Sequence, residues 1–121
     1  MIIDHCRNEE EFYSLYNSID NSNLPYAKDI LALKDYCFCF YTEEGKLLGV
    51  IYLEGRDKKT YLSGFSVRKN YQNILDGINA VCNHFSDDDI YSETPHKHAK
   101  IMLKKCGFEQ IKENLFIKRS K

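Results

Sequence analysis

The hydrophobic positions of the chain follow two different spacings. Apolar residues recur three or four positions apart in segments 12–19, 74–85 and 99–106, which is the pattern of an amphipathic helix. Elsewhere they form short runs, rich in aromatic and β-branched residues, between turn residues, which is typical of strands. The predicted strands are Met1–His5, Tyr36–Thr42, Leu47–Glu54, Thr60–Val67, Ile90–Thr94, Phe108–Lys112 and Leu115–Lys118.

The polar and special residues beside these segments predict where the helices begin and end. Asn8 is a favourable N-cap, and the three glutamates that follow it suit the positive end of a helix dipole. Pro25 suits the first turn of a second, shorter helix, and Pro95 predicts the opening of the last helix. Gly107 follows the last apolar position of that helix, where a left-handed residue commonly ends a helix.

The predicted order of elements is β-α-α-β-β-β-α-β-α-β-β. Its first half contains an antiparallel meander, and its second half alternates strands with helices, which requires some parallel pairing. We therefore expect an α/β domain spanning residues 1–121, with helices on both faces of a mixed sheet of six to seven strands. Gly64 interrupts the third strand of the meander, which favours a bulge or a close backbone approach.

Composition narrows the possible partners. The chain has 121 residues and a net charge of −1. Its overall charge therefore does not favour binding to nucleic acid or to an anionic membrane surface. No apolar run approaches the about 20 residues that cross a bilayer, and the N-terminus does not resemble a secretory signal. We expect a cytoplasmic protein, either a monomer or a homodimer.

The five cysteines match no standard zinc-binding spacing. Cys37 and Cys39 alternate within an aromatic run and are expected on one face of a strand. Buried free thiols in a reducing compartment explain the full set, namely Cys6, Cys37, Cys39, Cys82 and Cys106. A catalytic thiol is the less favoured alternative. Glu93, His96 and His98 also fit no standard ligand spacing, so we expect no metal site.

The last predicted helix and its end read His96-x-x-Ala99-x-x-Met102-Leu103-x-x-Cys106-Gly107-Phe108. This segment resembles a pattern of the GNAT acyltransferase superfamily, in which an asparagine is followed by Ala, Leu-Tyr and finally Gly-Phe. The spacing from Ala99 to Gly107 agrees without a gap. The predicted order of elements is also that of the superfamily. The resemblance implies a three-layer αβα sandwich, strongest from about Asp35 onward.

A second part of the resemblance is the loop between Val67 and Gly77. In the superfamily this loop has the form Arg/Gln-x-x-Gly-x-Gly/Ala and opens a helix whose backbone amides hold the diphosphate of acetyl-CoA. Gln72 and Gly77 fit that form, whereas Leu75 stands where the first glycine belongs. The resemblance implies cofactor contacts from Gln72, Asn73, Leu75 and Gly77, with added charge from Arg68 and Lys69. A plain solvated loop is the alternative.

The superfamily also splits two parallel strands, so that the pantetheine arm of the cofactor lies between them. The resemblance places Phe65, Ser66 and Val67 on one side of the split and residues 91–93 on the other. A bulge at Gly64 would help to separate the strands. An ordinary edge bulge would leave the same trace in the sequence.

Two residues that normally serve acetyl transfer are replaced. Leu103 occupies the position of the tyrosine that protonates the leaving thiolate, and His96 that of the usual asparagine. Glu93 and His96 are candidate bases, and the phenols of Tyr91 and Tyr71 are candidate acids. The alternative is that Glu93 and His96 are polar groups at a helix start, and that both tyrosines serve packing.

Two functions remain open from the sequence. The first is an N-acyltransferase that moves an acetyl or other acyl group from acyl-CoA to a small-molecule or protein amine. The second is a degenerate GNAT-like domain that acts as a ligand-sensing or protein-interaction module, including an accessory protein of a virus or mobile element. Leu75 and Leu103 favour the second reading. The first rests on what most proteins with this fold do.

Overall fold

The computed structural model describes residues 1–67 and 71–121, with the backbone alone at Tyr71. These residues form four helices and seven strands in the predicted order. The elements are β1 (Ile2–Asp4), α1 (Glu9–Asn17), α2 (Ala27–Leu31), β2 (Cys37–Tyr41), β3 (Leu47–Arg56), β4 (Lys59–Ser66), α3 (Tyr71–His84), β5 (Ile90–Glu93), α4 (Lys97–Lys105), β6 (Glu109–Lys112) and β7 (Leu115–Lys118). The predicted element order is confirmed. Arg68 and Lys69 lie outside the described residues.

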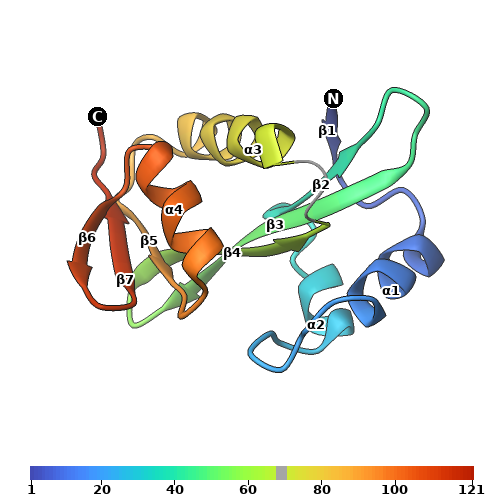
Figure 1. Ribbon diagram of the computed structural model, residues 1–121, viewed down its shortest axis with the longest axis horizontal. Coiled ribbons are helices and arrows are strands. Elements are labelled where there is room, and N and C mark those ends of the chain that lie inside the picture. The colour runs from blue at the N-terminus through green and yellow to red at the C-terminus, as the bar shows by residue number, and fades with distance from the viewer. Residues whose placement is uncertain (68–70) are drawn as a thin grey trace.

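The strands of the described residues form one mixed sheet in the order β1-β2-β3-β4-β5-β7-β6. All neighbouring strands are antiparallel except β4 and β5, which are parallel. Helices α3 and α4 lie on one side of the sheet, and α1 and α2 lie on the other side (Figure 1). The predicted three-layer arrangement around a mixed sheet is therefore confirmed.

Each face of the sheet carries its own hydrophobic core, because side chains alternate along a strand. In β2, Phe40 packs with α3 and α4, whereas Cys37 and Cys39 pack with α1 and α2. The two cysteines thus share a face, as predicted. All five cysteines are free thiols, and only Cys6 is not fully buried. Burial raises the pKa of the Cys82 thiol to about 11.

Two of the predicted helix signals have the expected geometry. The Asn8 side chain accepts hydrogen bonds from the backbone amides of Glu10 and Glu11 at 2.9 and 3.3 Å. At the end of α4, Gly107 has a φ of 88°, and the Phe108 amide donates to the Leu103 carbonyl at 3.0 Å. This is the Schellman arrangement, which only a left-handed residue closes without strain.

The two prolines lie just outside the helices that they were predicted to open. Helix α2 begins at Ala27 and α4 begins at Lys97, each after an intervening N-cap residue. Those N-caps, Tyr26 and His96, have extended ψ values of 143° and 126°. The chain therefore turns into the helix one residue later than the proline position suggests.

Gly64 serves a close approach and not a bulge. The register between β3 and β4 runs without a shift from the pair Gly49 and Ser66 to the pair Arg56 and Lys59. A Cβ atom at Gly64 would collide with the Val50 carbonyl and would lie 3.1 Å from the Ile51 Cα. Of the two alternatives expected for Gly64, the close backbone approach is confirmed, and the unshifted register rules out the bulge.

Candidate functional site

Strands β4 and β5 separate soon after they meet. Their register contains two pairs, Thr60 with Ile90 and Tyr61 with Tyr91. At the next position the Ser92 hydroxyl donates to the Leu62 carbonyl at 2.9 Å, and β4 then continues to Ser66 without β5 beside it. The predicted split between these strands is present in the described part of the chain.

The split leaves backbone groups of β4 directed at an open gap. The Leu62 carbonyl points toward β5, whereas the Val67 amide points the opposite way and donates to the Leu48 carbonyl at 3.1 Å. Backbone groups alternate in direction along a strand, so Gly64 and Ser66 direct theirs to the same side as Leu62. This edge can pair with an extended molecule that carries amide groups.

The gap opens into a cleft of about 1090 Å³ that reaches both faces of the sheet. Its apolar wall comes from α3 and α4, through Ile74, Ile78, Ala99, Met102 and Leu103. Its opposite wall comes from the segment between α1 and α2, through Ile19, Asp20, Asn23, Leu24 and Pro25. Residues far apart in the sequence therefore meet around the split strands.

The predicted contacts on β4 all lie at this cleft. Phe65, Ser66 and Val67 are among its lining residues. The Phe65 ring is fixed by edge contacts to the rings of Phe12 and Tyr16, at centroid distances of 5.7 and 5.6 Å. Helix α1 thereby holds the end of β4 in place from the other face.

The predicted contacts on α3 do not line the cleft. Leu75 is 9% exposed and belongs to the core between the sheet and the helices, where its carbonyl accepts from the Cys106 thiol. Gln72 instead donates to Asp76 at 3.1 Å, and Asn73 is half-buried. Gly77 faces the Phe40 ring, and a Cβ there would lie 2.5 Å from Phe40 Cε1. Gly77 thus permits close packing of α3 on the sheet.

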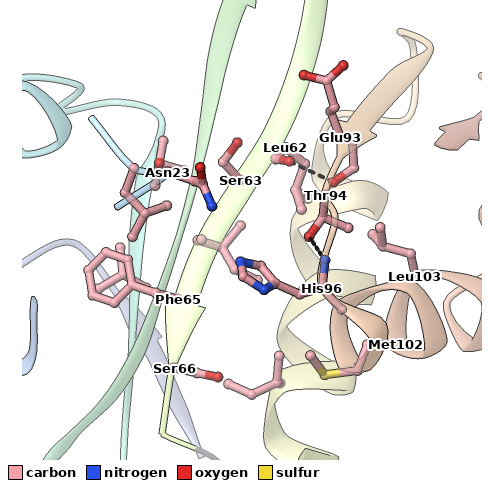
Figure 2. A pocket seen from close by; sticks show the side chains of 18 of the residues that line it. Asn23, Leu62, Ser63, Phe65, Ser66, Glu93, Thr94, His96, Met102 and Leu103 are labelled. Carbon is pink, nitrogen blue, oxygen red and sulfur yellow. Dashed lines mark hydrogen bonds between the residues drawn. The ribbon is translucent and has the colours of Figure 1, made fainter. Parts of the chain in front are cut away.

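His96 points into the cleft from the N-cap of α4, toward the space that Asn23 and Ser63 also face (Figure 2). Its backbone amide donates to the Thr94 hydroxyl at 3.2 Å, which fixes the turn from β5 into α4. The imidazole itself makes no N-cap hydrogen bond. Of the predicted catalytic side chains that the structure describes, His96 is the one directed into the open space.

The other predicted catalytic residues are placed differently. Glu93 lines the cleft, but its carboxylate points away from His96 (Figure 2) and pairs with Arg56 Nη1 at 3.6 Å. Tyr91 does not line the cleft. Its ring packs against Tyr61 at 5.6 Å and lies 5.0 Å from Lys59 Nζ. The Tyr71 side chain falls outside the described part of the structure.

Several lining residues were not indicated by the sequence, among them Asp20, Asn23 and Tyr52. Asp20 and Asn23 lie in a polar stretch without regular structure, and no local pattern marks them as facing a cleft.

Two hydrogen bonds from Ser22 hold the pKa of the Asp20 carboxyl below its usual value, and the nearby His96 lowers the same pKa by a smaller amount. Asp20 therefore keeps its charge beside His96.

Tyr52 is fully buried, yet its hydroxyl has no hydrogen-bond partner among the described residues. Burial, followed by the charge of Glu54, raises the pKa of the Tyr52 phenol well above its usual value. Ser63 lies opposite Tyr52 in the register and acts to lower the Tyr52 pKa. Its hydroxyl is nevertheless not placed to form a hydrogen bond with the phenol. Alternation along β3 marks Tyr52 as inward-facing, but only the structure shows its unpaired hydroxyl.

The described residues contain no group of three His, Cys, Asp or Glu side chains arranged to hold a metal ion. Within the same residues, none of the helices is both long and apolar enough to cross a membrane.

Similar solved structures identify the fold. A proposed acetyltransferase from Staphylococcus aureus Mu50 matches with a TM-score of 0.70 and 14% identity, over 100% of both chains. A GNAT-family acetyltransferase from Bacillus anthracis matches with a TM-score of 0.62 and 10% identity, over 98% of both chains. A variant of spermidine N-acetyltransferase from Vibrio cholerae matches with a TM-score of 0.62 and 11% identity, over 97% of this chain and 92% of that one.

Comparisons of sequence alone are negative, since no family model and no curated protein matches this chain. The structural matches extend over nearly the whole chain at low identity, so they establish the fold. They do not establish the activity, which has to be argued from the residues of the site. The mixed sheet of seven strands and the four helices of the described residues match these structures and agree with the fold expected from the sequence. The chain has the fold of the GNAT acetyltransferases.

Proposed function

We propose that this protein is an N-acyltransferase that moves an acetyl or other acyl group from acyl-CoA to an amine. The observation that carries the proposal is the split between β4 and β5, which leaves a free strand edge in a cleft that also holds His96. A fold alone does not fix an activity, and it is this combination of edge, cleft and base that the activity needs.

The pantetheine arm of coenzyme A is extended and contains two amide groups, so it suits the free edge of β4. In this proposal the backbone groups of Gly64 and Ser66 pair with the arm, as a further strand would. Ile74, Ile78 and Met102 supply an apolar wall along the same path. The donor therefore enters between α3 and α4.

The first turn of α3 is the proposed contact for the diphosphate, because the first amides of a helix have no partner within the helix. Gln72 and Asn73 lie in that turn. The Leu75 side chain packs in the core and does not line the cleft, so its bulk leaves the route free. Replacement of the usual glycine is therefore compatible with binding.

His96 is the proposed base. Bound acyl-CoA supplies an activated thioester carbonyl. An amine in the cleft attacks that carbon, the new C–N bond replaces the C–S bond, and His96 accepts the proton that the nitrogen loses. Glu93 is less suitable because Arg56 already pairs with its carboxylate at 3.6 Å, on the side away from His96.

Leu103 lines the cleft and carries no proton to give. A thiol has a reference pKa of about 8.5, so a thiolate leaves far more readily than an alkoxide and can take its proton from water. Loss of the usual tyrosine thus lowers the rate without preventing the reaction. Leu103 is also the observation that favours the alternative, a domain that binds the ligand without turnover.

Release of the coenzyme A thiol tests this function. The protein is incubated with acetyl-CoA, propionyl-CoA and butyryl-CoA, each with a panel of amines, and free thiol is followed together with the mass of the acylated amine. Acylated product that depends on both substrates is the expected result. Binding of acyl-CoA without product from any amine would support the non-catalytic alternative and contradict the transferase.

A further inference from the structure

Charged residues divide the cleft into two sides. Asp20, Glu54 and Glu93 bring three carboxylates to the wall formed by the α1–α2 segment and the ends of β3 and β5. Arg56 is the cation among them, and its guanidinium lies 3.5 Å from Glu54 and 3.6 Å from Glu93. This side keeps an excess of negative charge, whereas α4 contributes Lys97 to the other side.

Asp20 is the carboxylate of this wall that has no cationic side chain paired with it within the described residues. Its Oδ1 atom accepts both hydrogen bonds from Ser22, from the amide at 3.2 Å and from the hydroxyl at 2.8 Å. No such bond reaches Oδ2 from the described part of the chain. The turn therefore fixes the carboxylate and leaves one oxygen for a ligand.

Tyr52 provides a second and independent indication of a ligand on this side. It is a lining residue of the cleft, its side chain is fully buried, and its hydroxyl is unpaired within the described residues. Buried polar groups normally have partners, and one that has none gains a hydrogen bond when a ligand supplies the partner. The phenol oxygen can accept a bond from an ammonium group.

We propose that the acceptor carries two amines and no carboxylate: the Tyr52 hydroxyl and the charge of Asp20 hold one as an ammonium group, and the other, uncharged, attacks the thioester and passes its proton to His96. This inference rests on the proposed function and specifies its second substrate. An ammonium group carries three hydrogen-bond donors and one positive charge, which this wall matches with oxygen acceptors and negative charge. A carboxylate on the same acceptor would face Asp20, Glu54 and Glu93 and would be repelled.

The test compares 1,5-diaminopentane with lysine, which differ by one carboxylate. With a fixed acyl-CoA, we expect kcat/KM for the diamine to exceed that for lysine by about tenfold or more. Asp20→Asn retains the oxygen that accepts from Ser22 and removes only the charge. It should raise KM for the diamine about two- to fivefold and leave kcat nearly unchanged. Glu44→Gln, in the exposed turn before β3, is the matched control and should change neither.

Tyr52→Phe removes only the unpaired hydroxyl. Because that hydroxyl has no hydrogen-bond partner among the described residues, the melting temperature should stay the same or rise. KM for the diamine should rise about tenfold. The affinity for coenzyme A, measured by calorimetry on the same variant, should not change, which separates acceptor binding from donor binding.

Equal turnover of lysine and 1,5-diaminopentane would overturn this inference, and so would an unchanged KM in Tyr52→Phe. If coenzyme A binds and other amines are acylated while the diamine is not, the acceptor inference fails and the proposed function stands. If no coenzyme A species binds at all, the proposed function fails, and the acceptor inference fails with it.

Discussion

His96 is the residue on which the proposed chemistry depends, and its replacement gives the clearest prediction for a single side chain. His96→Gln keeps a polar group of similar size but removes the base. We expect kcat to fall by about a hundredfold or more, because general base catalysis typically contributes at least that factor. The affinity for acyl-CoA should remain the same, since the imidazole does not lie on the free edge of β4.

His84→Gln is the matched control, because His84 is exposed at the end of α3 and does not line the cleft. It should leave both kcat and binding unaltered. Full activity in His96→Gln together with strong loss in Glu93→Gln would instead assign the base to Glu93. Steady-state kinetics on the three variants decides between the two side chains.

At the same scale, residue type indicated the candidate side chains but not their environment. A histidine at a helix start and a glutamate at a strand end were both visible in the sequence. The pairing of Glu93 with Arg56 was not, because Arg56 lies at the end of a strand 37 positions earlier in the chain. The sequence also did not indicate the unpaired hydroxyl of Tyr52. That hydroxyl is unpaired within the described residues because Ser63, its neighbour on β4, does not form a hydrogen bond with it.

The contact between α3 and the sheet leads to a prediction at the scale of elements. Gly77 lets α3 approach Phe40, and an added methyl group would lie 2.5 Å from Phe40 Cε1. Gly77→Ala should lower the free energy of unfolding by about 1–3 kcal/mol, the usual cost of overpacking a core. Urea denaturation measures the change.

Gly55→Ala is the control for this change, since a Cβ atom there meets nothing within 4 Å. Pairing Gly77→Ala with Phe40→Leu should recover part of the lost stability, because the smaller side chain yields the space. If Gly77→Ala keeps full stability but loses affinity for coenzyme A, then Gly77 serves the diphosphate and the packing explanation is wrong.

Spacing in the sequence predicted the elements well because their signals are local. Asn8, Gly107 and the alternation of Cys37 and Cys39 each depend on residues within one turn or one strand. Gly64 shows the limit of this approach. A bulge and a close approach leave the same glycine in the sequence, and only the register with β3 distinguishes them.

At the scale of the whole molecule, the order of elements was predictable and the cleft only partly so. The apolar wall on α4 and the residues of β4 followed from periodicity and the resemblance. The opposite wall, with Asp20 and Asn23, comes from the segment between the first two helices, which carries no periodic pattern. Its place against the cleft depends on contacts distant in sequence, among them those of Phe65 with Phe12 and Tyr16.

The proposed function depends on the split between β4 and β5, which we expect to bind coenzyme A. Measuring that binding directly tests the proposal. Isothermal titration calorimetry of the protein with coenzyme A and acetyl-CoA should show one site per chain. The melting temperature should rise with ligand concentration, since a ligand at about 100 times its Kd stabilises the folded state by about 2.7 kcal/mol. No heat and no change in melting temperature with any coenzyme A species would contradict the account.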